Sequence, residues 1–125
     1  MGEFTHFNQH GDAIMVDISE KTETAREAIA EGRISMNQEC FDQLKAGSIG
    51  KGDVLGVSRI AGIMGAKKTS ELIPLCHLLN LTKTEIDFEL EDETCSVRTI
   101  CTVRTTGKTG VEMEALTGVQ IALLT

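Results

Sequence analysis

Two neighbouring runs of alternating residues constrain the fold of this chain more than any other feature. Residues 81–92 read LTKTEIDFELED, with apolar side chains on one face and acidic side chains on the other. Residues 94–106 read TCSVRTICTVRTT and alternate in the same way. The apolar positions expected to face inward are Ile86, Phe88, Leu90, Cys95, Val97, Cys101 and Val103, and the arginines expected outward are Arg98 and Arg104. Period-two alternation is typical of half-buried strands, so the runs predict an antiparallel hairpin that turns at residues 91–93.

Helices are predicted on both sides of this hairpin. Residues 37–47 predict a short helix, because Asn37 can cap its start and Gly47 can end it. Residues 51–72 predict a longer helix, in which Val54, Val57, Ala61 and Met64 recur at helical spacing on one face. Each of its glycines (Gly56, Gly62, Gly65) costs up to about 1 kcal/mol relative to alanine, so we expect close packing against another backbone. An apolar helix is predicted after Gly110.

The sequence does not determine the secondary structure of two segments that precede these helices. Residues 13–19 (AIMVDIS) fit a short strand. In residues 24–36 the alanines, glutamates and arginines favour a helix by propensity, while the spacing of arginine and isoleucine also permits a strand. The whole chain of 125 residues is the size of one domain, and with no Trp or Tyr its core must be mostly aliphatic.

The composition excludes several classes of function. A net charge of −7 makes nucleic acid an unexpected partner. We find no signal peptide, transit peptide or membrane span, so we expect a cytoplasmic protein with no membrane partner. The four cysteines show no C-x-x-C spacing and are interpreted as reduced thiols. No metal site is expected, because adjacent Cys76 and His77 cannot close one alone.

Three motifs have both a structural and a functional interpretation. The GKT of residues 107–109 lacks the glycine that a phosphate-binding loop needs five residues earlier, where Thr102 stands, so a plain turn is favoured. Glu112 and Glu114 complement a helix dipole without any catalytic role, and spacing alone favours that interpretation. His77 is either a satisfied core histidine or a proton carrier, and the residues around it do not decide between the two.

Taken together, the motifs of this chain resemble those of one family. The stretches MVDIS, KGDVLGVSRIAGIMGAKKTSELIPLCH and TTGKTGVEMEALTG are similar to the cyclic pyranopterin monophosphate synthase family, also called molybdenum cofactor biosynthesis protein C (MoaC). The resemblance runs from about residue 4 to the end. It implies a single α+β domain over residues 1–125, with a ferredoxin-like antiparallel sheet and helices packed on one face, in which residues 24–36 form a strand.

The resemblance also implies a reaction and an assembly. The family converts a cyclised dihydro-GTP to cyclic pyranopterin monophosphate and releases pyrophosphate, which makes the chain a lyase-type enzyme with a small nucleotide-derived substrate. No cofactor is implied, although Mg²⁺ can accompany the triphosphate. The implied assembly is a homo-oligomer, a hexamer built from dimers, with each pocket at a subunit boundary.

Site residues are carried over by motif. The substrate-binding residues that the resemblance implies are Leu75, Cys76, His77, Met113, Glu114, Lys67, Arg26 and Asp17. The implied catalytic residues are Lys51, His77, Glu112 and Glu114. These residue types suit the chemistry, because ring rebuilding needs proton carriers and pyrophosphate displacement needs cations.

The chain departs from the family in two places. Proline usually follows the histidine directly and again two residues later, whereas this chain has Leu78 and Asn80. The family also continues into a segment with a catalytic aspartate and lysine, and a chain seldom ends on a bare aliphatic helix, so we expect the protein to continue past Thr125. A non-catalytic nucleotide-binding subunit is therefore an alternative. A purely structural oligomerisation module is a third, which the clustered pocket residues disfavour.

Overall fold

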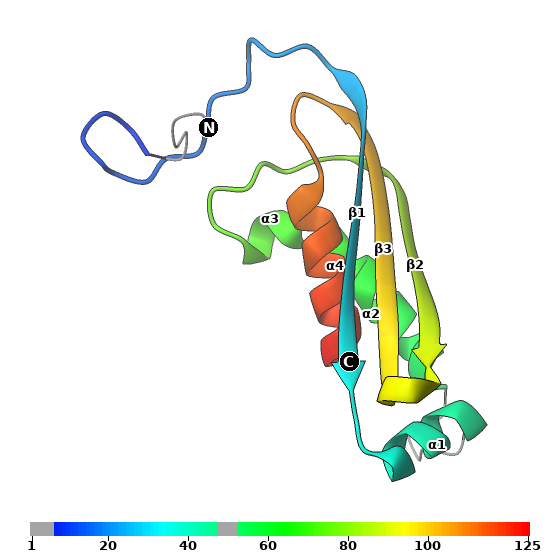
Figure 1. The fold of residues 1–125 in the computed structure, drawn as a ribbon. Coiled ribbons are helices and arrows are strands. Elements are labelled where there is room, and N and C mark those ends of the chain that lie inside the picture. The colour runs from blue at the N-terminus through cyan, green and yellow to red at the C-terminus, as the bar shows by residue number, and fades with distance from the viewer. Residues whose placement is uncertain (1–6, 48–52) are drawn as a thin grey trace.

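A computed structural model describes residues 7–47 and 53–125 of the chain (Figure 1). In chain order the elements are β1 (Thr24–Ser35), α1 (Gln38–Ala46), α2 (Val54–Lys67), α3 (Thr69–Leu72), β2 (Leu81–Glu91), a 3₁₀ turn (Asp92–Thr94), β3 (Ser96–Gly107) and α4 (Glu112–Leu124). This mixture of one sheet and separate helices confirms the predicted α+β class.

The three strands form one antiparallel sheet in the order β1-β3-β2. The predicted hairpin is confirmed, with Ile86 opposite Cys101 across β2 and β3. Helices α2 and α4 lie side by side on one face of the sheet (Figure 1). The β-α-β-β-α succession is that of a ferredoxin-like arrangement, and it leaves the end of β3 and the start of α4 close to the loop after α3.

The core lies between the sheet and α4. Cys101 and Val103 of β3 are fully buried there, and Ala115 and Val119 of α4 pack in the same cluster. Cys95 was expected to point inward from β3, and this prediction is wrong. It stands in the left-handed conformation (φ 49°) that closes the 3₁₀ turn, so the strand begins one residue later.

The segment 24–36, whose sequence was compatible with either a helix or a strand, forms strand β1 despite its helical propensity. Its alanines Ala28 and Ala30 pack on the core, while Glu27 and Glu31 form ion pairs on the outer face with Arg104 and Arg98 of β3. These cross-strand pairs stabilise the strand in a way that a local propensity scale does not register. The two arginines face outward as predicted.

Helix α2 packs on a different face from the one its apolar spacing suggested. Val57 and Met64 are 52% and 53% exposed, whereas the buried positions are Ser58, Gly62, Gly65 and Ala66. The glycine face is buried because it lets α4 approach: a Cβ on Gly62 would lie only 2.9 Å from the carbonyl oxygen of Gly118. Close packing against another backbone is thus confirmed for Gly62, whereas a Cβ on Gly65 would meet the side chain of Ile121.

Other boundaries partly match the predictions. Helix α1 begins and ends as expected, with the Asn37 side chain accepting a hydrogen bond from Cys40 N and Gly47 left-handed at φ 68°. The long helix predicted over residues 51–72 is interrupted at Lys68, and its first two residues lie outside the described residues. Residues 13–19 form no strand, since only an isolated bridge joins Ala13 to Phe7. None of the described helices is long and apolar enough to cross a membrane.

Candidate functional site

A pocket of about 330 Å³ opens where the loop after α3 meets the first turn of α4. Its size is at the lower end of the range for small-molecule sites. Six residues predicted for the site line it together: Leu75, Cys76, His77, Glu112, Met113 and Glu114. The loop 73–80 and the turn 107–111 are far apart in the sequence, and both lie at the same end of the sheet (Figure 1).

Short-range contacts shape the start of the loop. Thr69 is buried and its Oγ1 donates to Ala66 O at 2.8 Å, which ends α2 and starts the short α3. After Pro74, Leu75 adopts a left-handed backbone with φ 64°. This conformation is unfavourable for a residue with a branched side chain and is found mostly where surrounding structure holds it, often at functional sites. The strained residue directly precedes Cys76 and His77.

The end of the loop is also anchored. Thr105 of β3 is buried, and its Oγ1 donates to Asn80 O. The pairing of β2 with β3 is irregular between Leu81 and Lys83, just after this contact. The loop that lacks prolines at Leu78 and Asn80 is therefore held at its end by a side-chain hydrogen bond.

The two glutamates at the start of α4 diverge, as their spacing on a helix requires. Glu112 is exposed, and its carboxylate lies over Gly110, where an added Cβ would come within 2.3 Å of both carboxylate oxygens. Glu114 is only 3% exposed. Burial raises the pKa of the Glu114 carboxyl above its ordinary value, and the nearby charge of Glu112 adds to the rise, against a lowering by a backbone hydrogen bond.

Glu114 contacts Cys76 across the pocket. The Cys76 thiol donates to Glu114 Oε2 at 4.0 Å. Burial raises the pKa of the Cys76 thiol, and the Glu114 carboxylate raises it further. The thiol therefore stays protonated at neutral pH and acts as a hydrogen-bond donor, since a reactive cysteine needs a lowered pKa.

Residues 16–19, called the strap, contact His77 of this site and Lys108 of the turn before α4. The ring of His77 contacts the strap through Nε2, which lies 2.6 Å from Val16 O. Lys108 Nζ donates to Ser19 O at 3.3 Å, so the same strap also contacts the turn before α4. Asp17 accepts from Ser19 N at 2.9 Å, and this bond is the main reason that the Asp17 pKa is lowered, with a smaller contribution from His77.

Two of the predicted cations, Lys67 and Arg26, do not line the pocket. Lys67, at the end of α2, lines a small adjoining hollow that Glu114 also lines. Arg26 donates from Nε to Gly107 O at 3.1 Å, beside the turn that leads to α4. Lys51 lies outside the described residues. Within residues 7–47 and 53–125, no lysine or arginine lines the pocket itself.

The sequence of this chain is similar to those of a known protein family. Residues 15–125 match the sequence model of the MoaC family, and the matched range includes the strap, the loop and the first turn of α4. The chain belongs to the MoaC family. Curated relatives named cyclic pyranopterin monophosphate synthase include those of Clostridium perfringens strain 13, 54% identical over 98% of this chain and 78% of the relative, and Heliobacterium modesticaldum, 54% identical over 100% and 79%. A third, from Clostridium botulinum strain Alaska E43, is 56% identical over 98% and 77%.

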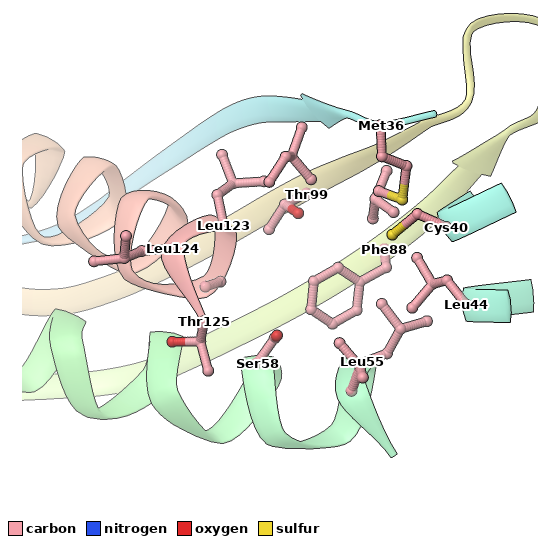
Figure 2. A pocket seen from close by; sticks show the side chains of 14 residues that line it. Met36, Cys40, Leu44, Leu55, Ser58, Phe88, Thr99, Leu123, Leu124 and Thr125 are labelled. Atoms are coloured by element: carbon pink, nitrogen blue, oxygen red, sulfur yellow. The ribbon is translucent and has the colours of Figure 1, made fainter. Parts of the chain in front are cut away.

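A second pocket of this MoaC-family chain lies at the other end of α4, between α1, α2 and the sheet (Figure 2). It is lined mainly by aliphatic side chains and Phe88 and has no lysine, arginine, histidine or carboxylate among its lining residues. The buried Thr99 Oγ1 at its wall has no hydrogen-bond partner among the described residues. A pocket without an acid or a base does not suit proton transfer, so the pocket at His77 is the candidate site.

Three positions of the site were not predicted from the sequence of this MoaC-family chain. Gly110 provides the room that the Glu112 carboxylate occupies, and Lys108 and the Val16 carbonyl hold the strap. The GKT motif contained Lys108 but was interpreted as a plain turn. No side-chain pattern could have revealed Val16, because it acts through its backbone. In the described part of the chain, no group of three or more His, Cys, Asp or Glu side chains could hold a metal ion.

Proposed function

We propose that this chain is a cyclic pyranopterin monophosphate synthase, a cytoplasmic lyase of molybdenum cofactor biosynthesis. It would convert a cyclised dihydro-GTP to cyclic pyranopterin monophosphate and release pyrophosphate. The observation that carries this proposal is the meeting of residues 75–77 and 112–114 in one pocket, joined by the contact of Cys76 with Glu114. The names of the curated relatives support it.

The pocket supplies groups suited to proton transfer. Glu114 is buried with a raised pKa, which brings a carboxyl closer to neutral pH and lets it act as an acid as well as a base. His77 is the side chain type that ordinarily titrates nearest neutrality. Glu112 stands at the exposed rim and can receive a proton from solvent or return it. Rebuilding the ring of the substrate requires several such transfers.

The triphosphate of the substrate must lie away from the two glutamates. We place it toward Lys67 and Arg26, with Lys51 as a further cation whose position the structure does not describe. Cations stabilise the negative charge that develops as pyrophosphate leaves. We propose no resident cofactor, and Mg²⁺ would come with the triphosphate as part of the substrate.

Assembly with further copies of the chain would complete the site. Helix α2 exposes an apolar stripe of Val57, Ile60 and Met64, at 52%, 62% and 53%. Exposed apolar patches mark interaction surfaces. We propose a homo-oligomer, a hexamer built from dimers, in which a neighbouring copy adds cations to the pocket. Nucleic acid and membranes are not expected partners. Light scattering should show a smaller particle for Ile60→Lys and an unchanged one for Thr82→Lys, an exposed position on β2.

The direct test is pyrophosphate release from the cyclised dihydro-GTP. Wild-type protein should release pyrophosphate, and His77→Ala should abolish release while leaving thermal unfolding almost unchanged. His10→Ala, an exposed histidine outside the pocket, is the matched control and should keep full activity. Wild-type protein that binds the nucleotide but releases nothing would support the alternative of a non-catalytic nucleotide-binding subunit. Unchanged turnover in His77→Ala would contradict the role of His77.

A further inference from the structure

The contact between the strap and His77 has a defined direction. Val16 O is a backbone carbonyl oxygen 2.6 Å from His77 Nε2. A carbonyl oxygen has no proton to give, so this hydrogen bond requires the proton to be on Nε2. In a neutral imidazole only one nitrogen is protonated, which leaves Nδ1 as the acceptor.

We propose that the Val16 carbonyl fixes His77 as the Nε2–H tautomer and thereby makes Nδ1 the nitrogen that exchanges protons with the substrate. The tautomer follows from the geometry alone, whereas its role in turnover rests on the proposed function. Val16 is a positioning residue in this scheme, because it acts on the substrate only through the ring of His77.

Contacts that do not involve His77 hold the strap in place. Lys108 Nζ donates to Ser19 O at 3.3 Å, and Ser19 N donates to Asp17 Oδ1 at 2.9 Å. The next turn is closed by Lys21 N, which donates to Ile18 O at 3.0 Å. The carbonyl of Val16 is therefore part of a segment with its own hydrogen bonds. Among the described residues, no hydrogen bond to His77 Nδ1 is found.

The loop gives the ring little orientation of its own. Leu78 and Asn80 leave the backbone after His77 without the torsional restriction that proline imposes. The side chain is only half-buried, so its packing also leaves freedom to rotate. A hydrogen bond from Nε2 removes that freedom, because a ring flip would exchange Nε2 with the carbon Cε1 and lose the bond.

The proposed proton transfer balances without another reactant. A substrate proton moves to Nδ1 and forms an imidazolium, in which Nε2–H still donates to Val16 O. That hydrogen bond becomes stronger, because its donor is now charged. The proton then leaves Nδ1 for another position on the substrate or for solvent, and neutral His77 is restored.

The first test is the tautomer itself, measured by nitrogen-15 NMR of histidine-labelled full chain. The spectrum is recorded at a pH of about 8.5, well above the ordinary histidine pKa of about 6.5. The resonances of His77 are those absent from the spectrum of His77→Gln. We expect a protonated Nε2 and an unprotonated Nδ1. A protonated Nδ1, or rapid exchange between both tautomers, would overturn the proposal, and neither outcome would bear on whether the chain releases pyrophosphate.

The second test asks whether the position of the strap determines the tautomer of His77. Lys108→Met should release the Ser19 end of the strap, give a mixture of tautomers and lower kcat several-fold with little change in KM. Lys21→Met is the matched control, an exposed lysine just after the strap, and should change neither quantity. If Lys108→Met kept both the pure tautomer and the wild-type kcat, the strap would not be what orients His77.

Discussion

The Cys76 thiol donates to Glu114 Oε2 at 4.0 Å and joins two segments whose contacting residues are 38 positions apart. One residue belongs to the loop after α3, and the other to the first turn of α4. Glu114 is almost fully buried, so its charge meets little solvent screening on the side of the thiol. The charge states of the two groups are therefore coupled, and changing one should be measurable at the other.

Glu114→Gln should lower the pKa of the Cys76 thiol. Burial is the larger cause of its rise above the ordinary value of 9.0, and the Glu114 charge is the second cause, so removing the charge brings the pKa partly back. The measurement is the rate of alkylation by iodoacetamide against pH, followed on the peptide that contains Cys76. The midpoint should move to lower pH in the variant.

Glu112→Gln is the matched control for this shift. It removes a charge from the same helical turn, but Glu112 is not among the causes of the Cys76 rise. Its alkylation midpoint should stay at the wild-type position. Equal midpoints in wild type and Glu114→Gln would mean that the thiol does not respond to this carboxylate.

The stability of the folded chain should depend on the ionisation of Glu114. Its folded pKa lies above the ordinary value of 4.5, so the folded state binds the proton more tightly than the unfolded state. The stability that comes from this tighter proton binding is fully present below the pKa of Glu114 in the unfolded chain. It is lost as the pH rises through the pKa of Glu114 in the folded chain. Relative to wild type, Glu114→Gln should therefore be more stable at neutral pH, with a smaller difference near pH 4.5.

Urea unfolding at these two pH values measures the effect. Glu23→Gln provides the comparison, because this exposed glutamate is not among the causes of the raised Glu114 pKa. An advantage of Glu114→Gln that grew as the pH fell would have the wrong sign and would contradict the raised pKa.

Much of the fold could be predicted because its signals are local. The alternation around Ile86 and Val103 defines two strands, and Asn37 and Gly47 define α1 through capping. The direction in which α2 packs could not be predicted from the spacing of Val57 and Met64. The face of α2 that is buried is the one with small residues, because they let the backbone of α4 come close. An apolar stripe on a helix indicates an interface but does not say which surface covers it.

The residues proposed for the site were identified from sequence motifs, but the contacts between them could not be predicted. Cys76 and Glu114 belong to motifs whose residues are visible in the sequence, but their contact depends on the packing of α4 against α2. Val16 left no signal because any residue type carries the same carbonyl. A contact made by a backbone group, such as that of the Val16 carbonyl with His77, is found only once the chain is folded.

Gly62→Ala should destabilise the packing of α2 on α4. An added Cβ would meet the Gly118 carbonyl oxygen at 2.9 Å and Ile86 Cδ1 at 2.1 Å. Overpacking of this kind costs about 1–3 kcal/mol, partly offset by the helix preference of alanine. Gly107→Ala is the control, since its Cβ would meet nothing closer than 3.8 Å, and should change the free energy of unfolding by less than about 0.5 kcal/mol. Equal stability of the two variants would contradict the close approach of the helices.

Gly110→Ala should reduce turnover through Glu112 without unfolding the chain. The new Cβ would lie 2.3 Å from both oxygens of the Glu112 carboxylate, and a flexible carboxylate can move aside. Displacing a catalytic group by about 1 Å can cost about 100-fold in rate, so we expect a loss of pyrophosphate release up to that size. A double-mutant cycle checks the cause: in a Glu112→Ala background, Gly110→Ala should have no further effect. A second, additive loss in that background would show that Gly110 acts on some other part of the site.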